Sequence, residues 1–288
     1  MPTVRLGKAL RGYKHNNECF QEGKGKFMDL SEVSRTAILP LLCRAIQSEM
    51  SDSTFNDPMA ILCLERLMSL SSEEEKKRIL KWRKMYTGIN TRDVKARMMT
   101  VRTFDCITSQ FISDNPGCTV VNLACGFDTR FWRIEADKCK YIELDLPEMI
   151  AVKSEILKDH LNYELIGCSV LDTSWIDKVT ANGNSNFLLL AEALFYYLPK
   201  DEVIRILQVI SQRFDHSELV LEIAPEKYTK GLWKRIIQLE SRAWDIDVSI
   251  VSGINNPREI ESYANGFKAI GITKGNVGPI VTVSVNAA

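Results

Sequence analysis

The chain has 288 residues, of which 45% are apolar and 26% are charged, and its 37 basic and 37 acidic side chains leave no formal net charge. This balance excludes a disordered chain, and it provides no overall field that would attract nucleic acid or anionic lipid. The longest apolar run, 187–198, is interrupted by Glu192 and is shorter than the roughly 18–20 residues of a membrane span. We therefore expect a folded protein of one or two domains, with neither a membrane nor a nucleic-acid partner.

The eight cysteines and three histidines are scattered along the chain, and they form no Cys-x-x-Cys pair and share no metal-ligand spacing. No signal peptide is apparent, so we expect free thiols in a reducing cytosol and a cytoplasmic location. A metal site is not expected.

The N-terminal part of the sequence predicts helices. Residues 1–30 carry six basic and three acidic side chains, and we expect a flexible arm or lid there. Apolar residues recur at helical spacing over 34–49. Asp57 followed by Pro58 is typical of a helix start, because Asp can cap and Pro lacks the N–H that a first helical residue leaves unpaired. A further helix is expected to open at Ser71 or Ser72 and to end at Gly88.

From Cys118 onwards the pattern becomes one of strands that alternate with helices. Such alternation predicts an α/β fold with a parallel sheet and helices on both faces. Strands are expected at 119–123, 141–145, 163–168, 186–191, 218–223, 268–273 and 280–285, and helices at 148–160, 174–179, 201–213 and 233–244.

The loop after the first strand is the first candidate for ligand binding. In parallel sheets a ligand binds beyond the carboxyl ends of the strands, beside the first strand. Small residues at Ala124 and Gly126 would allow a ligand close to the backbone. Asp145 ends the second strand 19 positions after Gly126, the offset at which a carboxylate accepts hydrogen bonds from ribose hydroxyls.

The loop composition separates two classes of ribose cofactor. A dinucleotide loop needs Gly-x-Gly-x-x-Gly, whereas this chain has Ala-x-Gly followed by Phe-Asp-Thr. Asp128 would stand where a phosphate must lie. S-adenosylmethionine carries a sulfonium and an ammonium group and no phosphate, so a nearby carboxylate favours it. An ordinary strand-to-helix turn is the alternative without a ligand.

Residues 121–133 resemble the first motif of the leucine carboxyl methyltransferase superfamily, usually Asn-Leu-Gly-x-Gly-x-Asp-Thr-Arg, which includes the tetracenomycin-type O-methyltransferases of polyketide pathways. The stretch 143–147 is similar to the family's acidic strand end, and 190–199 to its AEGxxxYL segment. The resemblance covers about 34–273, with further similarity at 36–45, 57–58 and 252–267. It implies a Rossmann-like class I methyltransferase domain over 31–288. This domain would have a helical cap at 31–115 and a core at 116–288, with seven mostly parallel strands and a helix inserted at about 228–245.

The resemblance also implies roles for individual residues. Asp145, with Leu146 beside it, looks like the ribose ligand, and Glu192 looks like the acid near the amino-acid end of the cofactor. Tyr197, and also Tyr196, resembles the tyrosine that faces the substrate and would be catalytic. The remaining cofactor-binding positions are the loop residues Ala124, Cys125, Gly126 and Asp128, and Ser169 and Val170 at the adenine edge.

Three positions depart from the family pattern. Ala124 replaces a glycine, and Ser169 replaces the usual aspartate. An arginine on the helix before the first strand holds the cofactor carboxylate in the family, but counting without gaps places Thr100 there. Arg97 or Arg102 could supply the charge instead.

The predicted activity is methyl transfer from S-adenosylmethionine, with S-adenosylhomocysteine as product, to a carboxylate or hydroxyl oxygen of a small molecule. A carboxylate acceptor needs no general base, and the absence of a motif histidine favours it. The alternatives are methylation of a protein C-terminal carboxylate, a non-catalytic binder of the cofactor, and a nicotinamide-linked oxidoreductase. The oligomeric state is not predicted.

Overall fold

The computed structural model describes residues 35–51, 53–88, 91–181, 183, 186–246 and 249–286. The arm expected at 1–30 lies outside these residues. Within them, no helix is long and apolar enough to cross a membrane.

Four helices form the N-terminal part of the described chain. Asp57 caps α4 as predicted, since its Oδ1 accepts a hydrogen bond from the Ala60 amide at 2.9 Å. Ser72 caps α5 by accepting from the Glu75 amide at 3.3 Å, and Gly88 follows the end of that helix. These helices are α3 (Ile38–Glu49), α4 (Pro58–Leu70), α5 (Glu73–Thr87) and α6 (Thr91–Asp114).

The remaining chain builds one sheet with its covering helices. The strands are β1 (Thr119–Leu123), β2 (Lys140–Asp145), β3 (Glu164–Gly167), β4 (Phe187–Ala191), β5 (Ser217–Glu222), β6 (Phe267–Lys274) and β7 (Pro279–Val285). The helices are α7 (Pro147–Leu157), α8 (Ser174–Thr180), α9 (Lys200–Arg213) and α10 (Gly231–Ala243).

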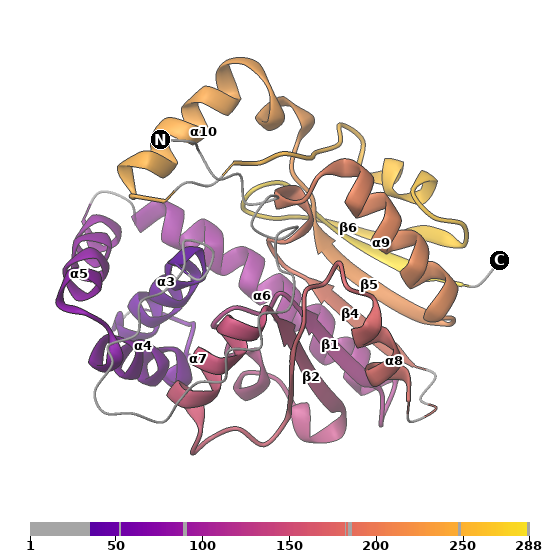
Figure 1. Cartoon of the computed structure of the whole chain (residues 1–288), viewed down its shortest axis with the longest axis horizontal. Helices are drawn as coiled ribbons and strands as arrows, with labels where there is room; N and C mark the ends of the chain where they lie inside the picture. Colours follow the sequence, from indigo (N-terminus) through magenta and orange to yellow (C-terminus); the bar gives the residue numbers. More distant parts are fainter. Residues whose placement is uncertain are drawn as a thin grey trace.

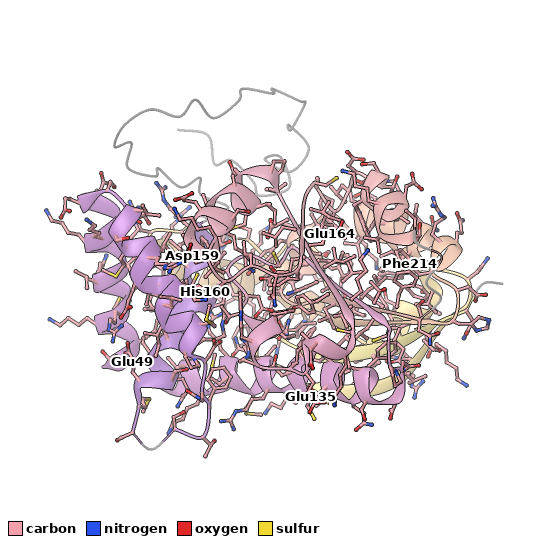
Figure 2. The ribbon with its side chains drawn as sticks, turned by 90° about the horizontal axis from the view of Figure 1, so that it is seen from below. Glu49, Glu135, Asp159, His160, Glu164 and Phe214 are labelled. Carbon is pink, nitrogen blue, oxygen red and sulfur yellow. The ribbon has the colours of Figure 1, made fainter. Side chains whose placement is uncertain are left out.

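The sheet order is β3-β2-β1-β4-β5-β7-β6. β7 runs antiparallel to both of its neighbours, β5 and β6, and the other neighbouring strands pair in parallel. The expected α/β fold with a seven-stranded, mostly parallel sheet is thereby confirmed. Figure 1 shows α3, α4 and α5 grouped at one end of the molecule, with α9 and β6 towards the other. Figure 2 likewise shows Glu49 of α3 and Phe214, just after α9, at opposite ends.

The two faces of the sheet are covered by different helices because successive strand residues point to opposite sides. Val121 and Leu189 pack in a core with α8 and α9, whereas Val120 and Leu188 pack with the second half of α6. The first half of α6 instead joins α3, α4, α5 and α7 in a separate helical core. The long helix α6 therefore connects the helical region to the sheet.

Candidate active site

The carboxyl ends of β1, β2, β4 and β5 meet at one edge of the sheet, and a cavity of about 340 Å³ lies against this edge. Residues Ala124, Asp145 and Glu192 follow or end these strands and line the cavity. Every site residue predicted from the sequence lines it except Arg102 and Ser169. The helical region and α10 supply the opposite walls, through residues such as Ala37 and Trp244.

The loop after β1 has a backbone that constrains its residue types. Gly126 has a φ of 51°, and a Cβ there would lie 2.9 Å from the Ala37 Cβ. A side chain at this position would therefore be strained and would also collide with the helical region. Ala124 has a φ of 53°, a left-handed conformation that costs a non-glycine residue about 1–2 kcal/mol.

A second left-handed alanine lies after β4. Ala193 has a φ of 53° at the position where the family segment has glycine. The sequence interpretation noted the departure at Ala124 but missed this one, although the same comparison with the family segment could have found it.

Asp145 is held in one orientation by the backbone. Its Oδ2 accepts from the Gly126 amide at 2.6 Å, and its Oδ1 accepts from the Leu146 amide at 2.7 Å. Burial raises the pKa of this carboxyl, and the two amide hydrogen bonds oppose that effect. Each carboxylate oxygen retains acceptor capacity. Such a group suits two adjacent hydroxyls.

Asp128 and Glu192 are both paired with Arg130, a residue of the first motif to which the sequence interpretation assigned no role. Arg130 is 0% exposed, and its Nη1 and Nη2 lie 2.6 Å from Asp128 Oδ2 and Glu192 Oε2. Although burial acts to raise it, the guanidinium groups of Arg130 and Arg133 hold the pKa of Asp128 well below its usual range. The negative charge of Asp128 is therefore compensated, which weakens the charge argument against a nearby phosphate.

The same ion-pair network ties the helical region to the loop. Asp57 Oδ2, at the start of α4, accepts from Thr129 Oγ1 at 2.6 Å and pairs with Arg133 Nη1 at 2.7 Å. Asp105 of α6 pairs with both Arg130 and Arg133. The helix cap at Asp57 thus also fixes the motif loop.

The structure separates the three candidates for a carboxylate clamp. Thr100 Oγ1 is buried and accepts from the Asn276 amide at 2.7 Å. Arg102 is exposed and donates to Thr54 Oγ1 at 2.6 Å, outside the cavity. Arg97 lines the cavity. Among the residues that the structure describes, its buried Nε has no hydrogen-bond partner and its side chain forms no ion pair. It is therefore the clamp candidate that fits.

Ser169 does not reach the cavity. Its hydroxyl accepts from the Leu171 amide at 3.3 Å, and its carbonyl accepts from the Asp172 amide. Val170 and Cys168, on either side of it, line the cavity instead. The structure therefore does not support an adenine-edge contact by the Ser169 side chain.

Aromatic side chains enclose another part of the cavity. The Tyr86 and Trp244 rings stack with centroids 4.6 Å apart, and Trp82 Nε1 fixes this arrangement by donating to the Trp244 carbonyl at 2.9 Å. The rings of Tyr196 and Tyr197 meet edge to face at 4.5 Å. These groups form a wall suited to an apolar, planar molecule.

These residues fit S-adenosylmethionine by the chemistry of their polar groups. The oriented Asp145 carboxylate suits a ribose. The Nε of Arg97, which has no hydrogen-bond partner among the described residues, suits a carboxylate.

Comparisons with known proteins find relatives over most of the chain. The family model for leucine carboxyl methyltransferase matches residues 37–211. The chain is 24% identical over 246 residues to the tetracenomycin polyketide synthesis O-methyltransferase TcmP of Streptomyces glaucescens. It is 25% identical over 255 residues to the S-adenosyl-L-methionine-dependent methyltransferase dpfgK of Gibberella zeae. Both matches cover 85% of this chain and 83% of the relative.

Solved structures also match in part. Magnesium protoporphyrin IX methyltransferase from Synechocystis PCC 6803, with bound SAH, gives a TM-score of 0.47 at 16% identity, covering 74% of this chain and 94% of that one. The N-methyltransferase NodS from Bradyrhizobium japonicum WM9, in complex with S-adenosyl-L-homocysteine, gives 0.42 at 13% identity, covering 64% and 86%. The family match and the curated relatives show that this chain belongs to the leucine carboxyl methyltransferase family and is an S-adenosylmethionine-dependent methyltransferase.

Proposed function

We propose that this chain methylates an oxygen atom of a small molecule that binds in the cavity beside the cofactor. The observation that carries the proposal is that one cavity joins the Asp145 and Gly126 edge to the aromatic wall of Tyr86, Tyr197 and Trp244. A planar, polyketide-like acceptor suits this wall, and the relative TcmP is named for polyketide synthesis.

Different cavity residues would hold different parts of the cofactor. Asp145 would accept the ribose hydroxyls, and Arg97 would hold the carboxylate. Val170 and Leu146 would flank the adenine, and Glu192 would lie near the amino-acid end. When bound, S-adenosylmethionine supplies a methyl group that its positive sulfur has already activated.

The residues of this chain would act mainly by positioning and by excluding water. The rigid loop from Ala124 to Asp128 and the Arg130 ion pairs fix one side of the cavity, while the helical region and α10 close the other. Holding two reactants in line can contribute about 7–11 kcal/mol to the barrier reduction. Tyr197 and Tyr196 would contact the acceptor.

A screen for S-adenosylhomocysteine release tests the proposal. Aromatic phenols, aromatic carboxylic acids and a peptide with a C-terminal leucine would be offered with labelled S-adenosylmethionine. We expect label transfer to at least one small aromatic acceptor. Lability of the product to mild base would distinguish a methyl ester from an ether.

Two variants of the binding site control this screen. Asp145→Ala should abolish product formation at limiting cofactor, and Ser169→Ala, whose hydroxyl does not reach the cavity, should retain it. Transfer to the peptide alone would favour the protein C-terminal alternative. Cofactor binding without transfer to any acceptor would favour a non-catalytic binder.

A further inference from the structure

Glu222 is a buried carboxylate to which the cofactor site gives no role. It ends β5 at the same sheet edge as Asp145 and Glu192, and it is 2% exposed. Its Oε1 accepts from the Val277 amide at 2.9 Å, and its Oε2 accepts from the Tyr196 hydroxyl at 3.3 Å. No cationic side chain of the described residues lies within hydrogen-bond distance of it. Burying such a carboxylate is costly, so a specific purpose is expected.

The Tyr196 hydroxyl connects Glu222 to the cavity. Tyr196 lines the cavity, and its ring meets that of Tyr197, which also lines it, edge to face at 4.5 Å. Glu222 itself is not part of the cavity lining. Tyr196 therefore links the acceptor side of the cavity to a buried carboxylate through one hydrogen bond.

The charged and titratable groups around Glu222 suit it for accepting a proton near neutral pH. Burial raises the pKa of Glu222 to about 7, and Glu192 adds to this effect. The Val277 amide, the Tyr196 hydroxyl and Arg97 act in the opposite direction. A base is most effective when its pKa lies near the working pH.

Tyr196 is suited to carrying a proton rather than keeping a charge. Burial raises the pKa of Tyr196 well above its usual value. Its phenol therefore stays neutral near pH 7, while its oxygen can accept one proton as its hydrogen passes to Glu222.

We propose that Glu222 takes up, through Tyr196, the proton that a hydroxyl acceptor loses, so that the substrate oxygen is that of a phenol or enol. This inference rests on the proposed O-methyl transfer. In the balanced step, the hydroxyl oxygen forms a bond to the methyl carbon, the carbon–sulfur bond breaks, and the electron pair of that bond stays on sulfur. The hydroxyl proton passes to the Tyr196 oxygen as the Tyr196 hydrogen passes to Glu222 Oε2.

The path distinguishes acceptor classes because a carboxylate has no proton to lose at pH 7. The sequence favoured a carboxylate acceptor, because no motif histidine was present that could act as a base for a hydroxyl. Glu222 supplies such a base through one intervening side chain. Glu222 does not touch the substrate, so its effect depends on Tyr196.

The test compares 2-naphthol with 2-naphthoic acid, two acceptors with the same ring system, at saturating S-adenosylmethionine. Glu222→Gln and Tyr196→Phe should lower the kcat for naphthol by about a hundredfold or more, with KM changed far less. The kcat of Glu222→Gln for naphthoic acid should stay within about twofold of the wild type. The pH profile for naphthol should lose its acidic limb near pH 7 in Glu222→Gln.

Tyr163→Phe is the matched control. Tyr163 also donates to a buried carboxylate, Glu143 Oε2 at 3.1 Å, but it does not line the cavity. Tyr163→Phe should leave the rates with both acceptors within about twofold of those of the wild type. Unchanged S-adenosylhomocysteine affinity would show that each variant folds.

Equilibrium binding gives a readout that does not depend on turnover. In the S-adenosylhomocysteine complex, 2-naphthol should bind several-fold more weakly below pH 7 than above it, because a protonated Glu222 no longer draws the hydrogen bonds along the path. Glu222→Gln should remove this dependence.

An equal loss of rate with both acceptors, or unchanged naphthol kinetics and pH-dependent binding in Glu222→Gln, would overturn the proton path. Methylation of the acid alone would overturn the hydroxyl assignment and leave O-methyl transfer standing. If the wild type methylates neither naphthol nor naphthoic acid, nor any acceptor of the screen above, the proposed function fails first.

Discussion

Replacing Arg97 with alanine should weaken the binding of S-adenosylhomocysteine but not that of 5′-methylthioadenosine, which lacks the amino-acid carboxylate. Arg97 projects from α6 into the cavity, where its buried Nε has no hydrogen-bond partner within the described part of the chain. The carboxylate of S-adenosylhomocysteine would accept a hydrogen bond from this group. 5′-Methylthioadenosine has no such carboxylate and would form no hydrogen bond with it.

The expected loss follows from the energy of charged hydrogen bonds. A hydrogen bond to a charged group contributes about 1.5–3 kcal/mol, and every 1.4 kcal/mol is about a tenfold change in Kd. Arg97→Ala should therefore weaken S-adenosylhomocysteine binding by about 10- to 150-fold. The stability of the free protein should change little, because the variant removes no ion pair that the described residues form.

Arg102→Ala is the matched control on the same helix. Arg102 is exposed and bonded to Thr54, so its removal should leave both affinities unchanged. Isothermal titration of the three proteins with the two ligands forms a complete cycle. For each protein, the contribution of the carboxylate is the difference between the binding free energies of the two ligands.

Two results would refute this reasoning. An equal loss of affinity for both ligands in Arg97→Ala would show that Arg97 shapes the cavity without binding the carboxylate. A selective loss in Arg102→Ala would move the clamp to the surface of α6.

Asp145→Ala should weaken adenosine binding by about 1.5–3 kcal/mol for each charged hydrogen bond lost, and it should leave adenine binding unchanged. If calorimetry shows equal losses of affinity for adenosine and adenine, Asp145 does not bind the ribose. Ala193→Gly should raise the free energy of unfolding by up to about 1.5 kcal/mol. The left-handed conformation costs alanine about 1–2 kcal/mol, whereas the greater unfolded-state entropy of glycine costs about 0.4–1 kcal/mol. A lower thermal midpoint would contradict that account. Lys153→Met should lower the urea-measured stability by about 3–5 kcal/mol because it leaves Glu143 buried without its cation, and a change below about 1 kcal/mol would argue against the pair. The pKa of Glu222 rises from 4.5 to about 7 on folding, so its contribution to stability should fall by about 3 kcal/mol as pH rises through that window. The difference in unfolding free energy between the wild type and Glu222→Gln should show this fall. A difference that does not vary with pH would indicate that the pKa of Glu222 in the folded protein is close to its usual value.

The parts of the structure that depend on local chemistry could be predicted from the sequence. The β1 and β4 strands are short apolar runs, and the caps at Asp57 and Ser72 act within a few residues. The position of Asp145 beside the Gly126 loop could be predicted because the loop follows β1 and Asp145 ends β2, the adjacent parallel strand. These signals need no knowledge of tertiary packing.

The parts that depend on tertiary packing could not be predicted. Arg130 pairs with Asp105 of α6 and with Glu192 after β4, which lie 25 and 62 positions away along the chain. Arg97 and Arg102 lie five positions apart on one helix and point to different sides, so only the packing of α6 decides between them.

Glu222 carried a signal that could have been used. It is an acid at the carboxyl end of a strand, as are Asp145 and Glu192, and all three belong to the same sheet edge. Its link to Tyr196 remained hidden, because the tyrosine lies 26 positions earlier in a short helix after β4.

A crystal structure of the protein with S-adenosylhomocysteine would test the central claim most directly. We predict that the ribose hydroxyls lie on the Asp145 carboxylate, that the amino-acid carboxylate lies on Arg97, and that the sulfur faces Tyr197. Ribose hydroxyls without contact to Asp145, or a ligand outside the cavity between the sheet edge and the helical region, would contradict the account.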